Sequence, residues 1–319
     1  HHPWMEVRAL CASEGRGERA YGDTVAWAQD TPIPALSAAL RLRDPGQLDP
    51  KETPLVFSAL PGSLAGPIET ALAQRGFWVV SNAASHRMDA NVPLLVPEVN
   101  RAHLELLRAQ PGPGAILNGP NCSTAGLVLA LAPLAQRFGL ATVLVTTLQA
   151  HSGAGLPGVL GPLANRNVLP RIEGEEDKLE TEPRKILGAL SNGQVEPLEF
   201  AISAMCNRVD VLDGHTECVS VGLQREASFE QIQQAWSQLP GLDLPSAPKH
   251  PARYLADPQS PNPVQHKNLD HGMSVVIGQL RPCPVLDWKF TLLSHNTLRG
   301  AAGGAILIAE IAIRNGLKG

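Results

Sequence analysis

The sequence lacks any apolar run long enough to cross a membrane. A spanning helix needs about 20 apolar residues, whereas the longest candidate, Gly126–Leu134, is short and contains Pro133. The first residues, HHPWMEVRAL, show neither the charged start nor the apolar core of a secretory signal. We therefore expect a cytoplasmic protein that makes no membrane contact.

Cysteine is scarce and its spacing forms no recognisable framework. The five cysteines stand at positions 11, 122, 206, 218 and 283, an odd number without a C-x-x-C pair. Secreted disulfide-rich domains carry even, closely spaced sets, so we expect reduced thiols here. Cys206, His215 and Cys218 match no zinc-binding spacing, and we expect no metal site.

Neither sign of charge dominates. The 26 basic and 30 acidic residues leave a net charge of −4, which gives no broad attraction to nucleic acid. The content of 44% hydrophobic and 18% charged residues is typical of a globular protein. Because 319 residues exceed what a single hydrophobic core usually fills, we expect two domains.

Strand and helix patterns alternate in the first half of the chain. Strands are predicted at 6–12, 54–59, 77–81 and 115–118, and helices at 65–76 and 101–110. This alternation is typical of a parallel, wound sheet. Small polar residues follow three of the strands, in LVFSALPGS, VVSNAAS and AILNGPNCS. Since such sheets bind ligands at the carboxyl ends of their strands, we expect a binding site there.

The second half has fewer helices and longer proline-rich loops. Strands are predicted at 142–147, 198–203, 216–222 and 273–279. This pattern favours an α+β domain whose sheet is mostly antiparallel. The final segment, 296–319, is rich in Ala, Gly and Ile, and predicts a buried helix that packs back on the first domain.

The glycine-rich stretches do not form a dinucleotide fingerprint. GAGLPG, with Gly153, Gly155 and Gly158, matches G-x-G-x-x-G as a string. The fingerprint also requires a helix directly afterwards, but VLGPLANRNVLP contains Pro162 and is a poor helix former. The string is therefore no evidence for a nucleotide site.

Cys122 stands where a helix begins. The strand AILN and the turn GPN precede it, and a long helical pattern follows. The free amide groups and positive dipole end of a helix N-terminus lower the pKa of a thiol, which predicts a reactive Cys122. In CNRVDVLDGHTECVS, His215 is a candidate acid or base and Arg208 a candidate partner for an anionic substrate.

Several segments together resemble one known family. GPNCSTAGLVLAL, TTLQAHSGAGLPGV, NVLPRIEGEEDKLE, CNRVDVLDGHTECVSV and LLSHNTLRGAAGGAILIAE follow one another along the chain. They resemble aspartate-semialdehyde dehydrogenase, in the branch found in archaea and fungi. The resemblance implies an α/β protein with a Rossmann-like parallel-sheet domain at 1–121 and 299–319. It also implies an α+β catalytic and dimerisation domain with a mixed, mostly antiparallel sheet at 122–298.

The resemblance also implies an activity. The family reduces L-aspartyl 4-phosphate with NADPH to aspartate semialdehyde and phosphate, in the biosynthesis of lysine, threonine and methionine. Cys122 would be the nucleophile and His215 the acid or base. The remaining substrate contacts would be Arg208 for the α-carboxylate, Glu175 for the α-amino group, Arg87 and Lys178 for phosphate, and Gln149 and Asn121 for the acyl group. A dimer or tetramer is implied as well.

The cofactor site is only partly represented in the sequence. Ser13 and Arg16 follow the second strand of the family, near the adenosine 2′-phosphate, while Ser152, Gly153 and Asn296 would approach the nicotinamide. Family members carry a strand, a Gly-rich turn and a helix before the equivalent of HHPWMEV. We therefore expect the first βα unit to be missing, and this chain to bind NADPH more weakly than one that carries it. Pro183 predicts that a helix restarts there, which separates Glu175 and Lys178 from it.

Two other functions stay open. A malonyl-CoA reductase-like enzyme would use the same thiol and hydride chemistry on a thioester. The acidic cluster EGEEDK favours an amino-acid substrate instead, because an α-ammonium group needs a carboxylate partner, although such a cluster is also typical of a solvated surface. The second alternative is a truncated, non-catalytic dimerising protein, against which the presence of Cys122, Arg208 and His215 argues.

Overall fold

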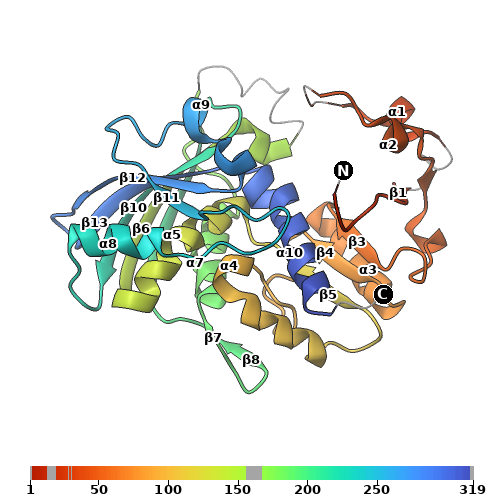
Figure 1. Cartoon of the computed structure of the whole chain (residues 1–319), viewed down its shortest axis with the longest axis horizontal. Coiled ribbons are helices and arrows are strands. Elements are labelled where there is room, and N and C mark those ends of the chain that lie inside the picture. The colour runs from red at the N-terminus through yellow and green to blue at the C-terminus, as the bar shows by residue number, and fades with distance from the viewer. Residues whose placement is uncertain (1, 13–18, 28, 30, 156–166, 317–319) are drawn as a thin grey trace.

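The computed structural model describes residues 2–12, 19–27, 29, 31–155 and 167–316 (Figure 1). Its first part contains β1 (Leu10–Cys11), α1 (Tyr21–Thr24), α2 (Ala35–Ala39), β2 (Leu42–Arg43), η1 (Pro45–Gln47), β3 (Leu55–Ser58), α3 (Gly62–Gln74), β4 (Trp78–Ser81), α4 (Pro97–Asn100), η2 (Arg101–Ala109) and β5 (Ala115–Asn118). The rest contains α5 (Cys122–Phe138), β6 (Leu140–Gln149), η3 (His151–Ala154), α7 (Glu175–Ile186), β7 (Ala189–Ser191), β8 (Gln194–Glu196), β9 (Ala201–Arg208), β10 (His215–Leu223), α8 (Phe229–Ser237), β11 (Ala252–Tyr254), α9 (Pro263–His266), η5 (Leu269–Gly272), β12 (Val275–Pro282), β13 (Trp288–Ser294), η6 (Leu298–Ala302) and α10 (Gly303–Arg314).

The first domain is built on parallel strands, as predicted. β3, β4 and β5 pair in that order and in parallel, with Ser58, Ser81 and Asn118 at their carboxyl ends. β1 and β2 form a separate parallel pair. The strand predicted at 6–12 is therefore reduced to Leu10–Cys11, because only these residues find a partner strand among the described residues. The helix predicted at 101–110 is a 3₁₀ helix, η2.

The second domain contains a mixed six-stranded sheet in the order β11-β12-β13-β10-β6-β9. The pairs β12–β13, β13–β10 and β10–β6 are antiparallel, while β11–β12 and β6–β9 are parallel. This agrees with the predicted mixed, mostly antiparallel sheet. β13 was not predicted, although WKFTLLS follows a turn and ends at the site.

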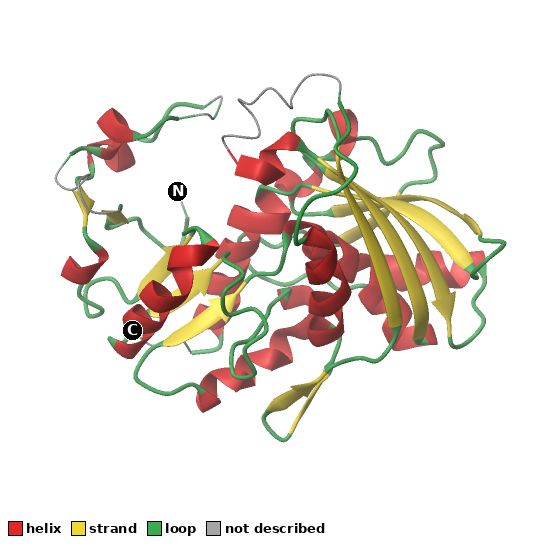
Figure 2. Cartoon of the chain, turned by 180° about the vertical axis from the view of Figure 1, so that it is seen from behind, coloured by secondary structure: helices red, strands yellow, loops and turns green. Residues whose placement is uncertain are grey.

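The helices α5, α7 and α8 pack on one face of this sheet, and the opposite face is not covered by these helices (Figures 1 and 2). α5 packs between the two domains, and twelve of its residues from Ser123 to Leu134 are buried. Leu127, Leu131 and Leu134 belong to the main apolar core. Such burial predicts that α5 is held by packing rather than by intrinsic helix propensity, since it contains Gly126 and Pro133.

The C-terminal helix returns to the first domain, as predicted. Ala305, Ile308 and Ala309 of α10 pack against Val80 of β4 and Leu117 of β5. On its other side, Leu307 and Ile311 pack against Met273 and Leu244 of the second domain. α10 therefore joins the two domains (Figure 1).

The prediction that a helix restarts at Pro183 is wrong. α7 runs without interruption from Glu175 to Ile186 with Pro183 inside it. A proline removes one amide hydrogen bond, and packing compensates for it, because Leu179, Pro183 and Ile186 are buried along the same helix. Glu175 and Lys178 thus belong to one rigid helix with the residues that follow.

Candidate active site

Cys122 is the first residue of α5, at the end of the loop that leaves β5. The side-chain oxygen of Asn121 caps the helix by accepting hydrogen bonds from the amides of Ser123 at 3.0 Å and Thr124 at 3.4 Å. β5 ends at Asn118, and the turn Gly119-Pro120 aims the chain into the helix. The predicted strand, turn and helix around the cysteine are confirmed.

His215 lies beside the thiol. Its Nε2 is 3.3 Å from Sγ of Cys122, and its Nδ1 accepts a hydrogen bond from the amide of Ala150 at 3.0 Å. Because Nδ1 accepts, Nε2 of the neutral ring carries the hydrogen and points it at the sulfur. Burial lowers the pKa of His215 to about 3, and Arg208 and His295 act in the same direction. The ring is a neutral hydrogen-bond donor to the sulfur.

The thiol is not ionised in the ligand-free chain. Burial and, to a smaller extent, the carboxylate of Glu175 raise the pKa of Cys122 to about 12, against the lowering effects of Arg87, the Ser123 amide and Arg208. The prediction of a lowered pKa is therefore wrong for this state. Desolvation and a like charge outweigh the helix N-terminus, so a ligand must change this environment before the thiolate forms.

Strand register brings the other predicted substrate residues beside the pair. β10 pairs with β13 so that His215 faces Ser294, and with β6 so that His215 lies next to Gln149 at the strand ends. Gln149 in turn faces Arg208 of β9. Nη1 of Arg208 donates to the carbonyl of Ala150 at 2.8 Å and lies 3.5 Å from Oε1 of Gln149. One row across four strands thus carries Ser294, His215, Gln149 and Arg208.

Glu175, at the start of α7, is held by three donors. Its oxygens accept hydrogen bonds from Asn121 Nδ2 at 2.7 Å, Lys178 Nζ at 2.7 Å and Gln149 Nε2 at 3.3 Å. Burial acts to raise the pKa of Glu175, but these three donors together hold it below its usual range. An ionised carboxylate thus contacts Asn121, the residue that precedes Cys122, where it can receive an ammonium group.

Arg87 reaches the site from the first domain. Nη1 donates to Oε1 of Glu182 at 2.8 Å, and Nη2 donates to the carbonyl of Asn82 at 2.8 Å. Its Nε is buried and has no hydrogen-bond partner among the described residues. A buried guanidinium with a donor to spare is suited to an anion such as phosphate.

Ser152, Gly153 and Asn296 lie close to His215. Asn296 donates from Nδ2 to Oγ of Ser152 at 2.8 Å and accepts from the amide of Gly214 at 2.9 Å. A Cβ on Gly153 would lie 2.5 Å from Nη1 of Arg208 and 3.0 Å from Nε2 of His215. Only glycine fits there. The other two predicted cofactor residues, Ser13 and Arg16, lie outside the described residues, as does Gly158 of the GAGLPG string.

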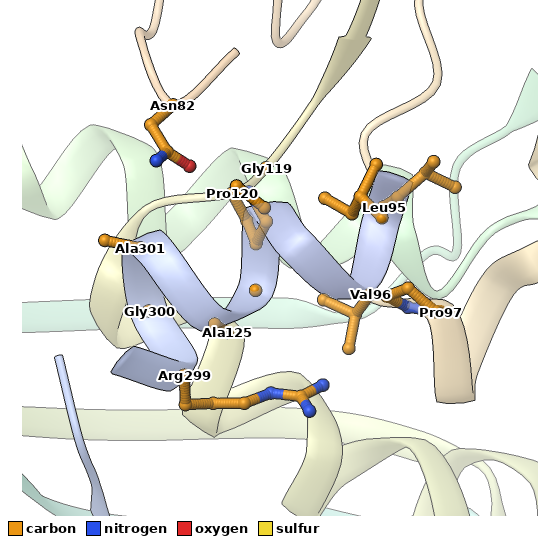
Figure 3. Close-up of a pocket in the computed structure, with 13 residues that line it drawn as sticks. Asn82, Leu95, Val96, Pro97, Gly119, Pro120, Ala125, Arg299, Gly300 and Ala301 are labelled. Atoms are coloured by element: carbon orange, nitrogen blue, oxygen red, sulfur yellow. The ribbon is translucent and has the colours of Figure 1, made fainter. Parts of the chain in front are cut away.

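A small cavity lies beside the start of α5, where Pro120 and Ala125 line it. The residues that line it include Asn82 and Gly119, at the ends of β4 and β5, and Gly300 and Ala301 of η6 (Figure 3). A Cβ on Gly300 would lie 2.6 Å from Cβ of Cys122. The turn of η6 is π-helical, and such turns are frequent at functional sites. Among the described residues, no group of three or more His, Cys, Asp or Glu side chains is placed to hold a metal ion.

Sequence reasoning missed several residues that the structure places here. Glu182 and Lys185 extend the face of α7 that carries Glu175 and Lys178, and Gly300 contacts the cysteine. The spacing of the four α7 residues, at intervals of three, four and three, is that of one helical face. This spacing is present in the sequence, but a helix break predicted at Pro183 divides the four residues between two segments. No spacing signal pointed to Gly300.

Comparisons with known proteins agree with this architecture. The family model "Semialdehyde dehydrogenase, NAD binding domain" matches residues 1–107, and "Semialdehyde dehydrogenase, dimerisation domain" matches residues 131–299. An aspartate-semialdehyde dehydrogenase of Archaeoglobus fulgidus is 42% identical over 98% of this chain and 92% of its own. That of Saccharomyces cerevisiae is 40% identical over 99% and 93%. A crystal structure of the Candida albicans aspartate-semialdehyde dehydrogenase with NADP has a TM-score of 0.87 and 36% identity, covering 98% and 92% of the two chains.

The chain thus combines a parallel sheet matched by an NAD-binding domain and a mixed sheet matched by a dimerisation domain. These two domains define a nicotinamide-dependent dehydrogenase. The matches to both domains narrow this class to a single family. The chain belongs to the aspartate-semialdehyde dehydrogenases, with relatives in archaea and fungi at 37–42% identity. Within the described ranges, no helix has the length and apolar character that crossing a bilayer requires.

Proposed function

We propose that the protein reduces L-aspartyl 4-phosphate with NADPH to L-aspartate 4-semialdehyde and phosphate, as a step of lysine, threonine and methionine biosynthesis. The observation that carries this proposal is the convergence of the thiol of Cys122 with a held carboxylate, Glu175, and a buried guanidinium, Arg208. An amino-acid acyl phosphate presents the matching ammonium, carboxylate and carbonyl groups.

The substrate is bound by opposite charges around the thiol. Glu175 receives the α-ammonium group and Arg208 the α-carboxylate, while Asn121 and Gln149, which both contact Glu175, orient the acyl group. Pairing Glu175 with an ammonium group offsets the negative charge that raises the pKa of Cys122. Substrate binding therefore favours the thiolate that attacks it.

Phosphate leaves toward the cationic side of the site. The sulfur of Cys122 attacks the acyl carbon, the carbon–oxygen bond to phosphate breaks with its electron pair on the phosphate, and a thioester remains on the protein. The departing phosphate takes up the proton that the thiol loses. Arg87, through its spare Nε, and Lys178, which is one-third exposed, stabilise the departing phosphate dianion. Lys178 is paired with Glu175 in the ligand-free chain, so it exchanges this partner for phosphate when an ammonium group arrives.

His215 acts at the carbonyl oxygen as a hydrogen-bond donor rather than as a base, because its Nδ1 already accepts from the amide of Ala150 and its pKa is lowered to about 3. With Ala150 bound to Nδ1, the hydrogen on Nε2 is available to the oxygen that becomes negative when the thioester is reduced. Collapse of that adduct breaks the carbon–sulfur bond and releases the aldehyde and the thiolate. NADPH, when bound, supplies the hydride.

The residues near Cys122 fit a nicotinamide group. Asn296, held by Ser152 and Gly214, offers an amide for the carboxamide, and Gly153 and Gly300 allow close approach to the pair because neither carries a Cβ. Ser13 and Arg16 would hold the adenosine 2′-phosphate and so favour NADP over NAD. The related Candida albicans enzyme crystallised with NADP, which supports the same cofactor here.

The packing supports the domain limits and the homo-oligomer that we propose. We place the cofactor domain at 1–121 with 299–319, because α10 packs on β4 and β5, and the catalytic domain at 122–298. The face of the six-stranded sheet away from α5 exposes Leu144 and Met205 by 44% and 60%. This face supports a homo-oligomer, in keeping with the dimerisation-domain description of the matching family model. A cytoplasmic location is in keeping with the proposed metabolic role.

The two alternatives are less well supported. A malonyl-CoA reductase would not need a carboxylate for an α-ammonium group, yet Glu175 is held ionised at the site by three donors. A non-catalytic protein would not need His215 within 3.3 Å of the sulfur. Both alternatives predict no turnover of aspartate semialdehyde.

The test follows NADPH formation from aspartate semialdehyde, phosphate and NADP by the full-length protein. We expect turnover in the wild type, loss of turnover in Cys122→Ser, and unchanged turnover in Cys283→Ser, which lies beyond β12 and away from the site. Turnover of malonyl-CoA alone would support the first alternative. Full activity in Cys122→Ser would contradict the assigned nucleophile.

A further inference from the structure

Glu182 joins the phosphate side of the site to the nucleophile side. Its Oε1 accepts from Nη1 of Arg87 at 2.8 Å, and its Oε2 accepts from the backbone amide of Asn121 at 2.7 Å. The side chain is 2% exposed. Arg87 comes from the loop after β4, whereas Asn121 directly precedes Cys122 at the start of α5.

The same helix also holds the loop that carries Arg87. Lys185, one turn beyond Glu182 on α7, donates from Nζ to the carbonyls of Arg87 at 2.7 Å, Asp89 at 2.8 Å and Val92 at 2.9 Å. The side chain of Arg87 and its backbone carbonyl therefore both form hydrogen bonds with side chains of α7. Glu175 and Lys178 of the same helix already contact the substrate side.

We propose that Glu182 is a positioning residue that sets the distance between the phosphate-binding guanidinium of Arg87 and the thiol of Cys122. The inference rests on the proposed function, because it assigns phosphate to Arg87 and acyl transfer to Cys122. The acyl phosphate spans these two groups, with its carbon at the sulfur and its phosphorus at the guanidinium. The carboxylate of Glu182 accepts one hydrogen bond from Arg87, at the phosphate end, and one from the residue before Cys122, at the acyl end, and so fixes both ends of that span.

A carboxylate is required at this position because both partners are donors. A glutamine offers one oxygen and one NH₂ group. One of the two partners, the guanidinium or the backbone amide, must therefore face the NH₂ group, which is itself a donor. The charged guanidinium makes the stronger hydrogen bond and keeps the oxygen. The amide of Asn121 then loses its acceptor, and the first turn of α5 shifts with Cys122.

The experiment compares Glu182→Gln and Glu182→Ala in the full-length protein, with Glu180→Gln as the matched control. Glu180 lies on the same helix and accepts a hydrogen bond from a backbone amide, that of Ala204 on β9, away from the substrate groups. The readouts are kcat and KM for inorganic phosphate with aspartate semialdehyde and NADP, the rate at which iodoacetamide alkylates Cys122, and the melting temperature.

We expect Glu182→Gln to lower kcat by about tenfold or more, the scale of one charge-assisted hydrogen bond, and to change KM for phosphate by less than about threefold. Glu182→Ala releases Arg87 as well and raises KM for phosphate by about tenfold or more. Glu180→Gln leaves both values within about twofold of the wild type.

The proposal is overturned if Glu182→Gln keeps kcat within about twofold of the wild type, or if both Glu182 variants change only the melting temperature. A wild type without turnover would refute the proposed function instead. In that case the alkylation rates alone test the positioning role of Glu182. Displacement of Asn121 should change the alkylation rate of Cys122 in Glu182→Gln but not in Glu180→Gln. Equal alkylation rates in all variants would then reject the positioning role.

Discussion

Replacing Glu175 with glutamine should move thiol reactivity and catalysis in opposite directions. Glu175 contacts Asn121, the residue before Cys122, and after burial it is the largest cause that raises the pKa of the thiol. Glutamine keeps the size of the side chain but removes its charge. The free thiol therefore becomes more acidic, while the substrate loses the partner of its α-ammonium group.

The size of both effects follows from the contacts. Removing a like charge at this range lowers a pKa by about 1 unit, which raises the thiolate fraction, and hence the alkylation rate below the pKa, about tenfold. Losing one hydrogen bond between charged groups costs about 1.5–3 kcal/mol, which lowers kcat/KM for aspartate semialdehyde about 10- to 100-fold.

The assay alkylates wild type and Glu175→Gln with iodoacetamide at about pH 8, close to the usual pKa of a cysteine thiol. Peptide mass spectrometry then measures the extent of alkylation at Cys122 separately from that at the other four cysteines. Glu176→Gln is the control, because Glu176 turns away to accept from the amide of Cys206. Slower or equal alkylation of Cys122 in Glu175→Gln would refute the electrostatic reasoning. Faster alkylation with unchanged kcat/KM would refute the role in substrate binding.

Three further predictions rest on single residues. Gly153→Ala should lower kcat at least about tenfold, because the added Cβ meets Arg208 and His215, and steady-state activity within about twofold of the wild type would contradict the close packing. The His215 ring should not titrate between about pH 5 and 8, since its pKa is lowered to about 3, and an NMR titration of the ring with a midpoint near 6.5 would show otherwise. Glu217 on β10 is fully buried, neither oxygen has a partner among the described residues, and burial raises its pKa well above 4.5. The folded wild type thus retains a proton that the unfolded chain releases, and its stability falls as pH rises above 4.5. The Glu217→Gln variant has no such proton to retain, so its free energy of unfolding in urea should exceed that of the wild type by an amount that grows from about pH 5 to 8. A difference that stays constant over this range would contradict a protonated Glu217.

The strand, turn and helix that position Cys122 could be predicted from the sequence, because local patterns determine them. AILN forms β5 with the predicted limits, and the helix begins at Cys122, since a turn of Gly, Pro and Asn precedes a long apolar pattern. The strand around His215 and its place near Cys122 were also predicted. The described residues assigned to the substrate belong to one network of contacts, which Arg87 joins through Glu182.

The failures arise where tertiary contacts override local rules. A proline usually ends a helix, but burial of Leu179 and Ile186 keeps α7 continuous through Pro183. A helix N-terminus usually acidifies a thiol, but burial and Glu175 outweigh it at Cys122. Glu182 joins residues 61 and 95 positions away, and no short-range pattern reveals such a bridge.

Mass spectrometry of the acyl enzyme tests the central claim most directly. The full-length protein is mixed with aspartate semialdehyde and NADP in the absence of phosphate, so that the thioester forms but is not released by phosphorolysis, and is then quenched in acid. We predict an aspartyl adduct on the peptide that contains Cys122, absent from Cys122→Ser. An adduct elsewhere, or turnover with phosphate but no adduct on Cys122, would contradict the assignment of this thiol as the nucleophile.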